Sequence, residues 1–305
     1  MKAAHQLWNQ TPTAEDITYV VPAGLTEMLL EKYYNHDDLF ISPNAIDIST
    51  EEILITEAKK WLSNIWNTPG AIILKPAGAY ADTELRLLYA ITSRSLGYLN
   101  NRYGYFFDVM DRGLDYTKEA IPVSKTKAET GFHTDSTAKN YLPDIVGLLC
   151  LQPALQGGES LITNAANLLN HLYSVYPEYV DLLESPLYRD VITPGTTQNT
   201  DAVRANDIPL FQFDKEDGVI FRYMRYWIES ALEKLQEPTP IGLTEMLNAI
   251  DAFFSLPENT LCFKMDRGDI LFVNNRFLCH NRTAFTDGDK PRVFVRAWIN
   301  QSPQD

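Results

Sequence analysis

Residues 131–136 of the chain read Gly131-Phe132-His133-Thr134-Asp135-Ser136. One residue separates His133 from Asp135, and on an extended segment this spacing sends both side chains to the same face. A third ligand from a distant strand would complete one triangular face of an octahedron, and His280 is the candidate. Two imidazoles and one carboxylate that leave the opposite face open are typical of non-haem iron oxygenases. A His-x-Asp pair alone is common. Together with His280, however, it makes an oxygenase the leading hypothesis.

Two arginines follow His280 at twelve and sixteen residues, Arg292 and Arg296. Both share one face of a predicted strand with Phe294, because side chains alternate along an extended chain. A buried arginine is costly unless it meets an anion. The anion is either an internal Asp or Glu or the carboxylate of a bound molecule, which guanidinium binds in a bidentate manner.

Four motifs together resemble the TauD/TfdA family of iron(II)- and 2-oxoglutarate-dependent dioxygenases, with the clavaminate-synthase-like enzymes as close relatives. They occur in the order of the family and extend over residues 131–300, with weaker similarity over 70–112. The four motifs are residues 131–136 (Gly-Phe-His-Thr-Asp-Ser), 157–161 (Gly-Gly-Glu-Ser-Leu), 267–275 (Arg-Gly-Asp-Ile-Leu-Phe-Val-Asn-Asn) and 280–285 (His-Asn-Arg-Thr-Ala-Phe).

The resemblance implies the cofactors iron(II), 2-oxoglutarate and dioxygen, with His133, Asp135 and His280 as the iron ligands. It implies that Arg292 binds the distal carboxylate of 2-oxoglutarate, helped by the hydroxyl of Ser160. Arg296 is similar to a second arginine that several members direct at an acidic group of the prime substrate. Because the spacing after the second histidine varies among members, the roles of the two arginines could be exchanged.

The reaction implied is hydroxylation of an unactivated C–H bond, coupled to conversion of 2-oxoglutarate to succinate and CO2 (EC 1.14.11 type). Asp135 disfavours halogenation, because related halogenases have a small residue at the carboxylate position. Desaturation, cyclisation or another oxidative tailoring step in secondary metabolism is an alternative outcome with the same cofactors. A pseudoenzyme that binds a metal and small acids without turnover is the alternative of a different class.

Candidate substrate contacts are weaker. Arg222 and Arg225 lie in an aromatic segment between a strand and a helix, Glu129 lies four residues before His133, and Asn275 lies in a turn. Arginines combined with a carboxylate favour a small acidic or zwitterionic metabolite, such as an amino acid or a derivative. A sulfonate, an aryloxy acid or an amino acid tethered to a carrier protein would use similar anchors, and each residue is also consistent with a structural role.

The 305 residues include 40 acidic and 26 basic side chains, giving a net charge of −14. So acidic a chain is expected to repel nucleic acid and anionic membranes, which leaves a small molecule as the expected partner. Neither a secretory signal nor an apolar stretch of the ~18 residues of a membrane span is found. The three cysteines are widely spaced and read as reduced thiols, so a cytoplasmic location is expected. A homo-oligomer remains possible.

The apolar periodicity predicts short strands mixed with amphipathic helices, which indicates a β-sandwich or barrel core with helices outside. The resemblance refines this α+β, mainly β core to a double-stranded β-helix (jelly-roll, cupin-like) in a single domain, residues 1–305. The predicted helices are 51–66, 82–97, 168–176, 227–235 and 243–254. The predicted strands are 70–76, 146–151, 159–163, 210–213, 219–223, 260–265, 269–273 and 292–299.

Overall fold

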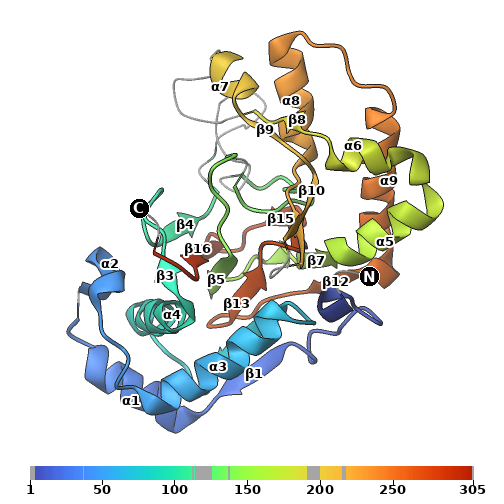
Figure 1. Ribbon diagram of the computed structural model, residues 1–305. Coiled ribbons are helices and arrows are strands. Elements are labelled where there is room, and N and C mark those ends of the chain that lie inside the picture. The colour runs from blue at the N-terminus through green and yellow to red at the C-terminus, as the bar shows by residue number, and fades with distance from the viewer. Residues whose placement is uncertain are drawn as a thin grey trace.

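A computed structural model describes residues 4–36, 38–111, 113, 126–136, 138–190, 200–214 and 218–303. Its central feature is a seven-stranded sheet in the order β1-β2-β13-β5-β16-β3, with β4 also paired to β16 (Figure 1). All neighbours in it are antiparallel except β1 and β2. The strands are β1 (Thr18–Val21), β2 (Ala71–Pro76), β3 (Tyr98–Leu99), β4 (Phe107–Val109), β5 (Ile145–Gln152), β13 (Ile270–Asn274) and β16 (Val293–Asn300).

Side-chain alternation gives this sheet two different faces. In β13, Ile270 and Phe272 pack into a core shared with helices, whereas Leu271 and Val273 pack toward a second, smaller sheet. This division follows from the two-residue period of an extended chain. Because both faces of β13 are covered, all of its residues before Asn274 are apolar.

Three helices cover the first face of the large sheet, at the lower left of Figure 1. They are α1 (Ala23–Tyr33), α3 (Glu52–Trp66) and α4 (Asp82–Leu96). The helices predicted over 51–66 and 82–97 are confirmed as α3 and α4. Ala81 is the N-cap of α4: its backbone N–H donates to Glu84 at 2.7 Å, and Asp82 belongs to the first turn.

The second sheet has three strands in the order β12-β7-β14. They are β12 (Thr260–Phe263), β7 (Ser160–Asn164) and β14 (Leu278–Arg282). An apolar core that includes Ile73, Ile162 and Leu271 lies between this sheet and the large one. The predicted strands at 159–163 and 260–265 are therefore confirmed. β14 was not among them, because its second half, from His280 onward, is polar.

A further group of elements packs against the outer side of the second sheet, at the upper right of Figure 1. The longer ones match the predicted hairpin and three predicted helices: β10 (Phe211–Asp214), β11 (Gly218–Phe221), α5 (Ala165–Val175), α8 (Arg225–Leu235) and α9 (Leu243–Ser255). The shorter ones are α6 (Val180–Glu184), α7 (Thr200–Arg204), β8 (Leu187–Tyr188) and β9 (Asp207–Ile208). Two other short strands, β6 (Gln156–Gly157) and β15 (Phe285–Thr286), pair with each other, and the short helix α2 (Asp38–Ile41) packs beside α4 on the opposite side of the molecule.

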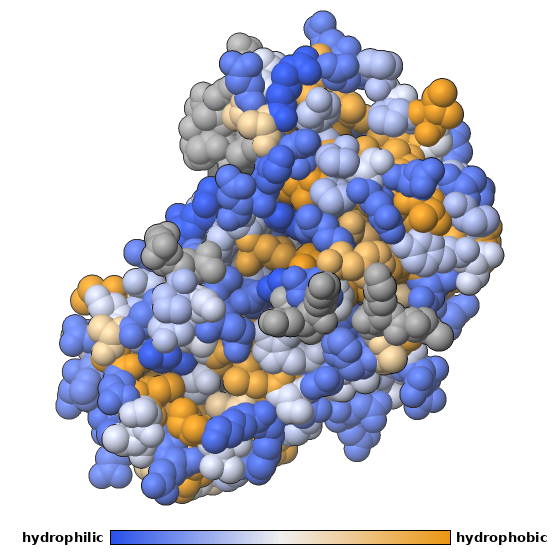
Figure 2. Space-filling view, viewed as in Figure 1, coloured by the Kyte–Doolittle hydropathy of each residue, from blue (hydrophilic) through white to orange (hydrophobic). Residues whose placement is uncertain are grey.

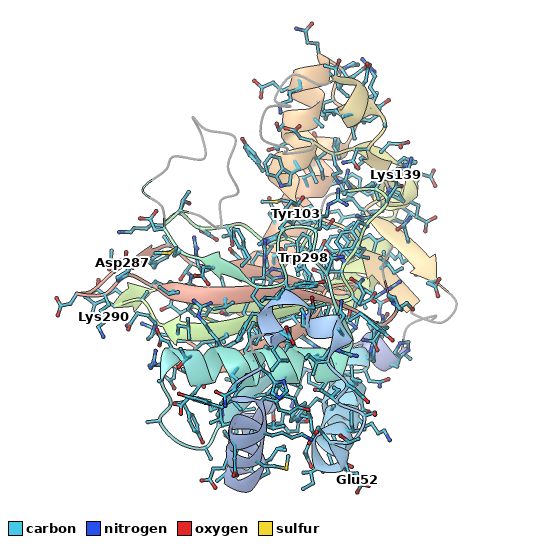
Figure 3. All side chains as sticks on the ribbon, turned by 90° about the vertical axis from the view of Figure 1, so that its left-hand side faces the viewer. Glu52, Tyr103, Lys139, Asp287, Lys290 and Trp298 are labelled. Carbon is cyan, nitrogen blue, oxygen red and sulfur yellow. The ribbon has the colours of Figure 1, made fainter. Side chains whose placement is uncertain are left out.

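The molecule is thus a mixed α/β structure with a large, mainly antiparallel sheet, as Figure 3 shows edge-on with helices packed below it. The face seen in Figure 2 is largely hydrophilic, with scattered hydrophobic patches. None of the described helices combines the length and the apolar character that a bilayer crossing requires.

Candidate active site

Two segments far apart in the sequence carry the histidines and pair with each other. His280 lies in the middle of β14, and the extended segment containing His133 runs antiparallel to it. The backbone N–H of His133 donates to the His280 carbonyl at 3.0 Å, and the His280 N–H donates to the His133 carbonyl at 2.9 Å. This reciprocal pair places the two imidazole rings side by side, with ring centroids 4.4 Å apart.

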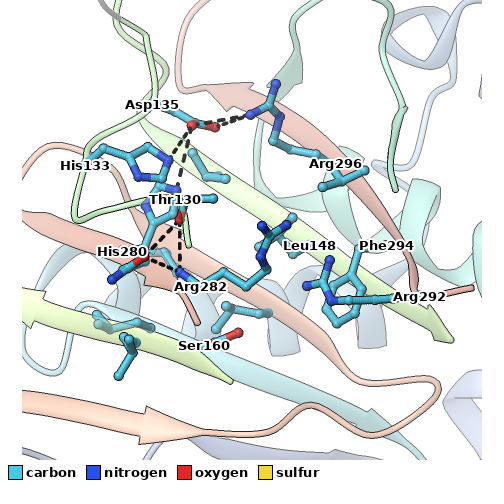
Figure 4. Close-up of a pocket in the computed structure, with 17 residues that line it drawn as sticks. Thr130, His133, Asp135, Leu148, Ser160, His280, Arg282, Arg292, Phe294 and Arg296 are labelled. Atoms are coloured by element: carbon cyan, nitrogen blue, oxygen red, sulfur yellow. Dashed lines mark hydrogen bonds and ion pairs between the residues drawn. The ribbon is translucent and has the colours of Figure 1, made fainter. Parts of the chain in front are cut away.

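The side chains of His133, Asp135 and His280 converge at one point (Figure 4). One donor atom from each residue lies within 4.8 Å of the other two. The Nε2 atoms of both histidines lie 3.7 Å from Oδ1 of Asp135, which is too long for a hydrogen bond and leaves room for an ion between the three atoms. The sequence pattern predicted this convergence.

Both imidazole rings direct their Nε2 atoms toward Oδ1 of Asp135. Nδ1 of His133 lies 2.8 Å from the Gly131 carbonyl, so Nδ1 carries the proton and Nε2 presents its lone pair. Burial, together with the neighbouring His280, lowers the pKa of His133 from 6.5 to about 4. The ring is therefore neutral at physiological pH, the form that binds a metal.

The carboxylate of Asp135 is 5% exposed and has a polar partner on the side away from the histidines. Oδ2 accepts a hydrogen bond from Nε1 of Trp298 at 2.6 Å and lies 3.2 Å from the Arg296 guanidinium. Burial opposes ionisation, but Arg296 and the two histidines outweigh it and hold the pKa of Asp135 well below its usual range. Oδ1 remains directed at the two imidazoles.

His133, Asp135 and His280 line a cavity with a volume of about 70 Å³. Arg292 lines it too. Its side chain is buried with 4% exposure, and its Nε and Nη1 atoms have no hydrogen-bond partner. The guanidinium lies over the Phe294 ring at 3.8 Å. Burial and the neighbouring Arg282 lower the pKa of Arg292 to about 9. A buried cation with unused donors is suited to a bound anion.

Ser160 begins β7 and lines the cavity beside these arginines (Figure 4). The turn before it needs glycine: Gly157 has φ +69°, and a Cβ there would lie 2.1 Å from the Ala284 carbonyl oxygen. The Gly157-Gly158 pair therefore lets β6 approach β15 closely, next to the cavity.

Comparisons with known proteins agree with this geometry. Residues 33–298 match the model of the family described as "Taurine catabolism dioxygenase TauD, TfdA family". This chain belongs to the TauD/TfdA family. Members of the family are non-haem iron, 2-oxoglutarate-dependent dioxygenases, so the chain is an enzyme of that class and the expectation from the motifs is confirmed.

One similar protein is the FR-33289 synthase of Streptomyces rubellomurinus (strain ATCC 31215), with 26% identity over 95% of this chain and 87% of that protein. Two solved structures share the fold. Asparagine oxygenase, in complex with Fe(II), (2S,3S)-3-hydroxyasparagine and succinate, has a TM-score of 0.64, 18% identity, and coverage of 93% of this chain and 94% of that one. The non-haem iron oxygenase OrfP, in complex with Fe, succinate and (3R,4R)-dihydroxy-L-Arg, has a TM-score of 0.62, 16% identity and the same coverage.

Within this TauD/TfdA chain, two of the residues singled out for substrate binding contact protein groups instead. The terminal nitrogens of Arg222 donate to the carbonyls of Ala138, Lys139 and Tyr141, and Arg222 does not line the cavity. Asn275 is fully buried and bonds to Asp135 through both the backbone N–H, at 2.7 Å, and the carbonyl, at 3.0 Å. The terminal nitrogens of Arg222 and the amide of Asn275 thus bond to loop backbone, and Nε of Arg222 has no partner among the described residues.

The other two substrate candidates line a second cavity of about 450 Å³, which shares Thr130 and Asn281 with the first. Arg225 forms ion pairs with Glu229 at 2.7 Å and Asp251 at 2.6 Å, so its charge is already neutralised. Glu129 is exposed, and its Oε1 accepts a hydrogen bond from Asn281 at 2.7 Å.

Two residues that sequence reasoning did not select also belong to the site. Trp298 contacts Asp135, and Arg282 lines the cavity next to Arg292. Trp298 could have been found, because it is two residues after Arg296 and therefore on the same face of the strand. Arg282 is also two residues from a selected residue, His280, but the apolar periodicity does not extend the predicted strands to this polar segment.

Proposed function

We propose that His133, Asp135 and His280 hold the catalytic iron(II), and the observation that carries this proposal is the convergence of two Nε2 atoms on one carboxylate oxygen. The donor set of two imidazoles and a carboxylate fits iron(II) with open coordination positions. When bound, the iron supplies the oxygen chemistry, in which 2-oxoglutarate becomes succinate and CO2 while a substrate C–H bond is hydroxylated. The protein orients its ligands: Gly131 fixes the His133 ring, and Trp298 and Arg296 fix the carboxylate.

Arg292 is the proposed anchor for the distal carboxylate of 2-oxoglutarate, with the Ser160 hydroxyl beside it. Of the two arginines whose roles could be exchanged, Arg296 has its guanidinium against Asp135, whereas Arg292 has two buried nitrogens without a partner. This difference supports Arg292 as the cofactor anchor. Arg296 then serves mainly to orient the iron ligand Asp135. Any contact that it makes with the C1 carboxylate of 2-oxoglutarate or with the substrate is secondary.

The prime substrate is proposed to be a small acidic or zwitterionic metabolite, an amino acid or a derivative. Asparagine oxygenase and OrfP, which have the same fold, are described in complex with hydroxylated amino acids. Glu129 supports a positively charged group on the substrate, because it lines the second cavity, is exposed, and accepts a hydrogen bond from the neutral amide of Asn281. Thr130 and Asn281 line both this cavity and the one that contains the iron ligands.

The two sheets that carry the site are proposed to form the double-stranded β-helix of the family in a single domain, residues 1–305. Support comes from the origin of the site residues: His280 and Ser160 belong to the three-stranded sheet, whereas Arg292 borders β16 and Arg296 belongs to it, in the large sheet. The match to the family model over residues 33–298 supports one continuous unit.

The test is succinate formation from 2-oxoglutarate by protein loaded anaerobically with iron(II) and then exposed to oxygen, in the presence of metabolite pools. A substrate product heavier by 16 Da indicates hydroxylation, and one lighter by 2 Da indicates desaturation or ring closure. His133→Ala should abolish both iron binding and succinate formation. His171→Ala is the matched control, since His171 lies in α5 among aromatic rings and not in the cavity. No succinate above an iron-only control would favour the pseudoenzyme.

A further inference from the structure

Two buried arginines, not one, border the part of the cavity assigned above to 2-oxoglutarate. Arg282 is 7% exposed and Arg292 is 4% exposed, and both line the cavity. Their guanidinium groups extend toward the same region of the cavity (Figure 4) and lie against the same ring, Phe285, at 4.8 and 5.2 Å. The Nε atoms of both have no hydrogen-bond partner. A single arginine would suffice to bind one carboxylate, so the second needs an explanation.

The other end of the Arg282 guanidinium is already engaged. Its Nη2 donates to the backbone carbonyls of Thr126, at 3.0 Å, and of Ala128. The backbone of Arg282 is bonded to the same segment. Its N–H donates to the Thr130 hydroxyl at 3.0 Å, and its carbonyl accepts from the Thr130 N–H at 3.2 Å. Arg282 therefore lies between the cofactor region and residues 126–130, which lead into the iron-binding segment.

Residues 126–130 also form the substrate side of the site. Thr130 lines both cavities, and Glu129 lines the second one. Thr130 donates its hydroxyl hydrogen to Asn281, whose amide in turn holds Glu129. The position of these side chains depends on where the carbonyls of Thr126 and Ala128 are held, and the Arg282 side chain holds both.

Charge makes the two arginines interdependent. Both guanidinium groups are buried, line the same cavity and lie over the same ring, Phe285. Like charges in a poorly solvated cavity repel each other, and an anion placed between them removes that repulsion.

We propose that Arg282 is a positioning residue that links binding of the 2-oxoglutarate carboxylate to the ordering of residues 126–130, and thereby to substrate binding. This inference rests on the function proposed above. The carboxylate that Arg292 binds also compensates the charge of Arg282, which fixes the Arg282 side chain against the carbonyls of Thr126 and Ala128. Glu129 and Thr130 then take their substrate-binding positions.

The test uses binding rather than turnover, with Mn²⁺ as a redox-inert ion in place of iron. Calorimetry measures the Kd of 2-oxoglutarate, and hydrogen–deuterium exchange measures protection of peptides covering residues 126–130. In the wild type, 2-oxoglutarate should protect these peptides. Arg282→Gln should raise the Kd about tenfold or more, the usual effect of losing a charge-assisted contact, and should abolish the protection. Arg282→Lys should recover part of the affinity, because it keeps the charge, but little of the protection, because one ammonium cannot reproduce the planar fork.

Arg222→Gln is the matched control. Arg222 is likewise buried, holds loop carbonyls and has an unpartnered Nε, but it does not line the cavity. It should change the Kd less than twofold and leave the protection of 126–130 intact. Equal effects of Arg282→Gln and Arg222→Gln, or an unchanged Kd and protection in Arg282→Gln, would overturn the inference. If Arg282→Gln does not fold, the same criteria apply to Arg282→Lys.

Arg292→Gln separates this inference from the proposed function. If it weakens 2-oxoglutarate binding while Arg282→Gln does not, only the link through Arg282 fails. If 2-oxoglutarate binds Arg292→Gln as it binds the wild type, the assignment of the cofactor site itself is wrong.

Discussion

The indole N–H of Trp298 donates a hydrogen bond of 2.6 Å to Oδ2 of Asp135, while Oδ1 of the same carboxylate faces both histidines at 3.7 Å. The two carboxylate oxygens thus differ in their partners. Oδ2 is held by Trp298 and by Arg296 at 3.2 Å, whereas Oδ1 faces the two histidines and has one longer protein contact, with Nη1 of Arg296 at 3.4 Å. Trp298 packs against Tyr103, with ring centroids 5.4 Å apart (Figure 3), and also against Tyr141, with ring centroids 5.6 Å apart. These contacts restrict its ring, so its N–H has a fixed direction.

Trp298→Phe should lower the affinity for divalent metal by about tenfold, the usual range for losing a hydrogen bond to a metal ligand. The phenyl ring keeps the packing against the tyrosines, but Asp135 can then rotate. The Kd of Mn²⁺ measured by calorimetry checks this. Tyr103→Phe, which alters the packing partner but not the bond to Asp135, is the control. Equal metal affinity in Trp298→Phe and the wild type would mean that Arg296 alone orients the carboxylate.

Substitutions of Arg292 and of Arg296 should weaken the binding of different ligands. Arg292→Gln removes the buried cation with unused donors and should weaken 2-oxoglutarate binding by about tenfold or more, with metal affinity retained. Arg296→Gln removes the partner of Asp135 and should weaken metal binding first. Calorimetric titration of each variant with Mn²⁺ and then with 2-oxoglutarate distinguishes them. The reverse pattern would assign the co-substrate to Arg296.

Substitution of Asn275 should lower both the free energy of unfolding and the affinity for metal. Its amide satisfies the backbone N–H and carbonyl of Asp135 and also the carbonyl of Pro143, all buried. Asn275→Ala leaves these groups unpaired and should cost about 2–3 kcal/mol in the free energy of unfolding, measured by urea denaturation. Asn274→Ala is a useful control, because buried Asn274 holds the Ile65 carbonyl and the Arg276 N–H instead. It should lower stability but not metal affinity, whereas Asn275→Ala should lower both.

The sequence predicted the parts of the site that depend on local periodicity. His133 and Asp135 share a face because they are two residues apart on an extended segment, and Arg292, Phe294 and Arg296 share one for the same reason. The strands and helices with clear apolar periods were also predicted within a few residues, as α3 and β5 illustrate.

Contacts between distant segments could not be predicted from these patterns. Whether a buried arginine faces a cavity or a loop carbonyl depends on packing, and Arg222 and Arg292 look alike in the sequence. The strand β14 was missed because its polar residues face a site rather than solvent, so it lacks the apolar signal of a buried strand. Arg282 was missed with it.

The metal-free protein should lose stability in mild acid because of His133. In the unfolded chain this histidine takes up a proton near its ordinary pKa of 6.5, whereas in the folded protein burial and His280 keep its pKa at about 4. Between these values the unfolded state binds more protons, so the free energy of unfolding falls as the pH is lowered from 7, by about 2 kcal/mol at pH 5 from this group. Urea denaturation in the presence of a chelator, repeated across this range, measures the slope. His133→Gln, which cannot take up the proton, should flatten it, and His171→Gln should not. Equal slopes for His133→Gln and the wild type would show that His133 is as easily protonated in the folded protein as in the unfolded chain.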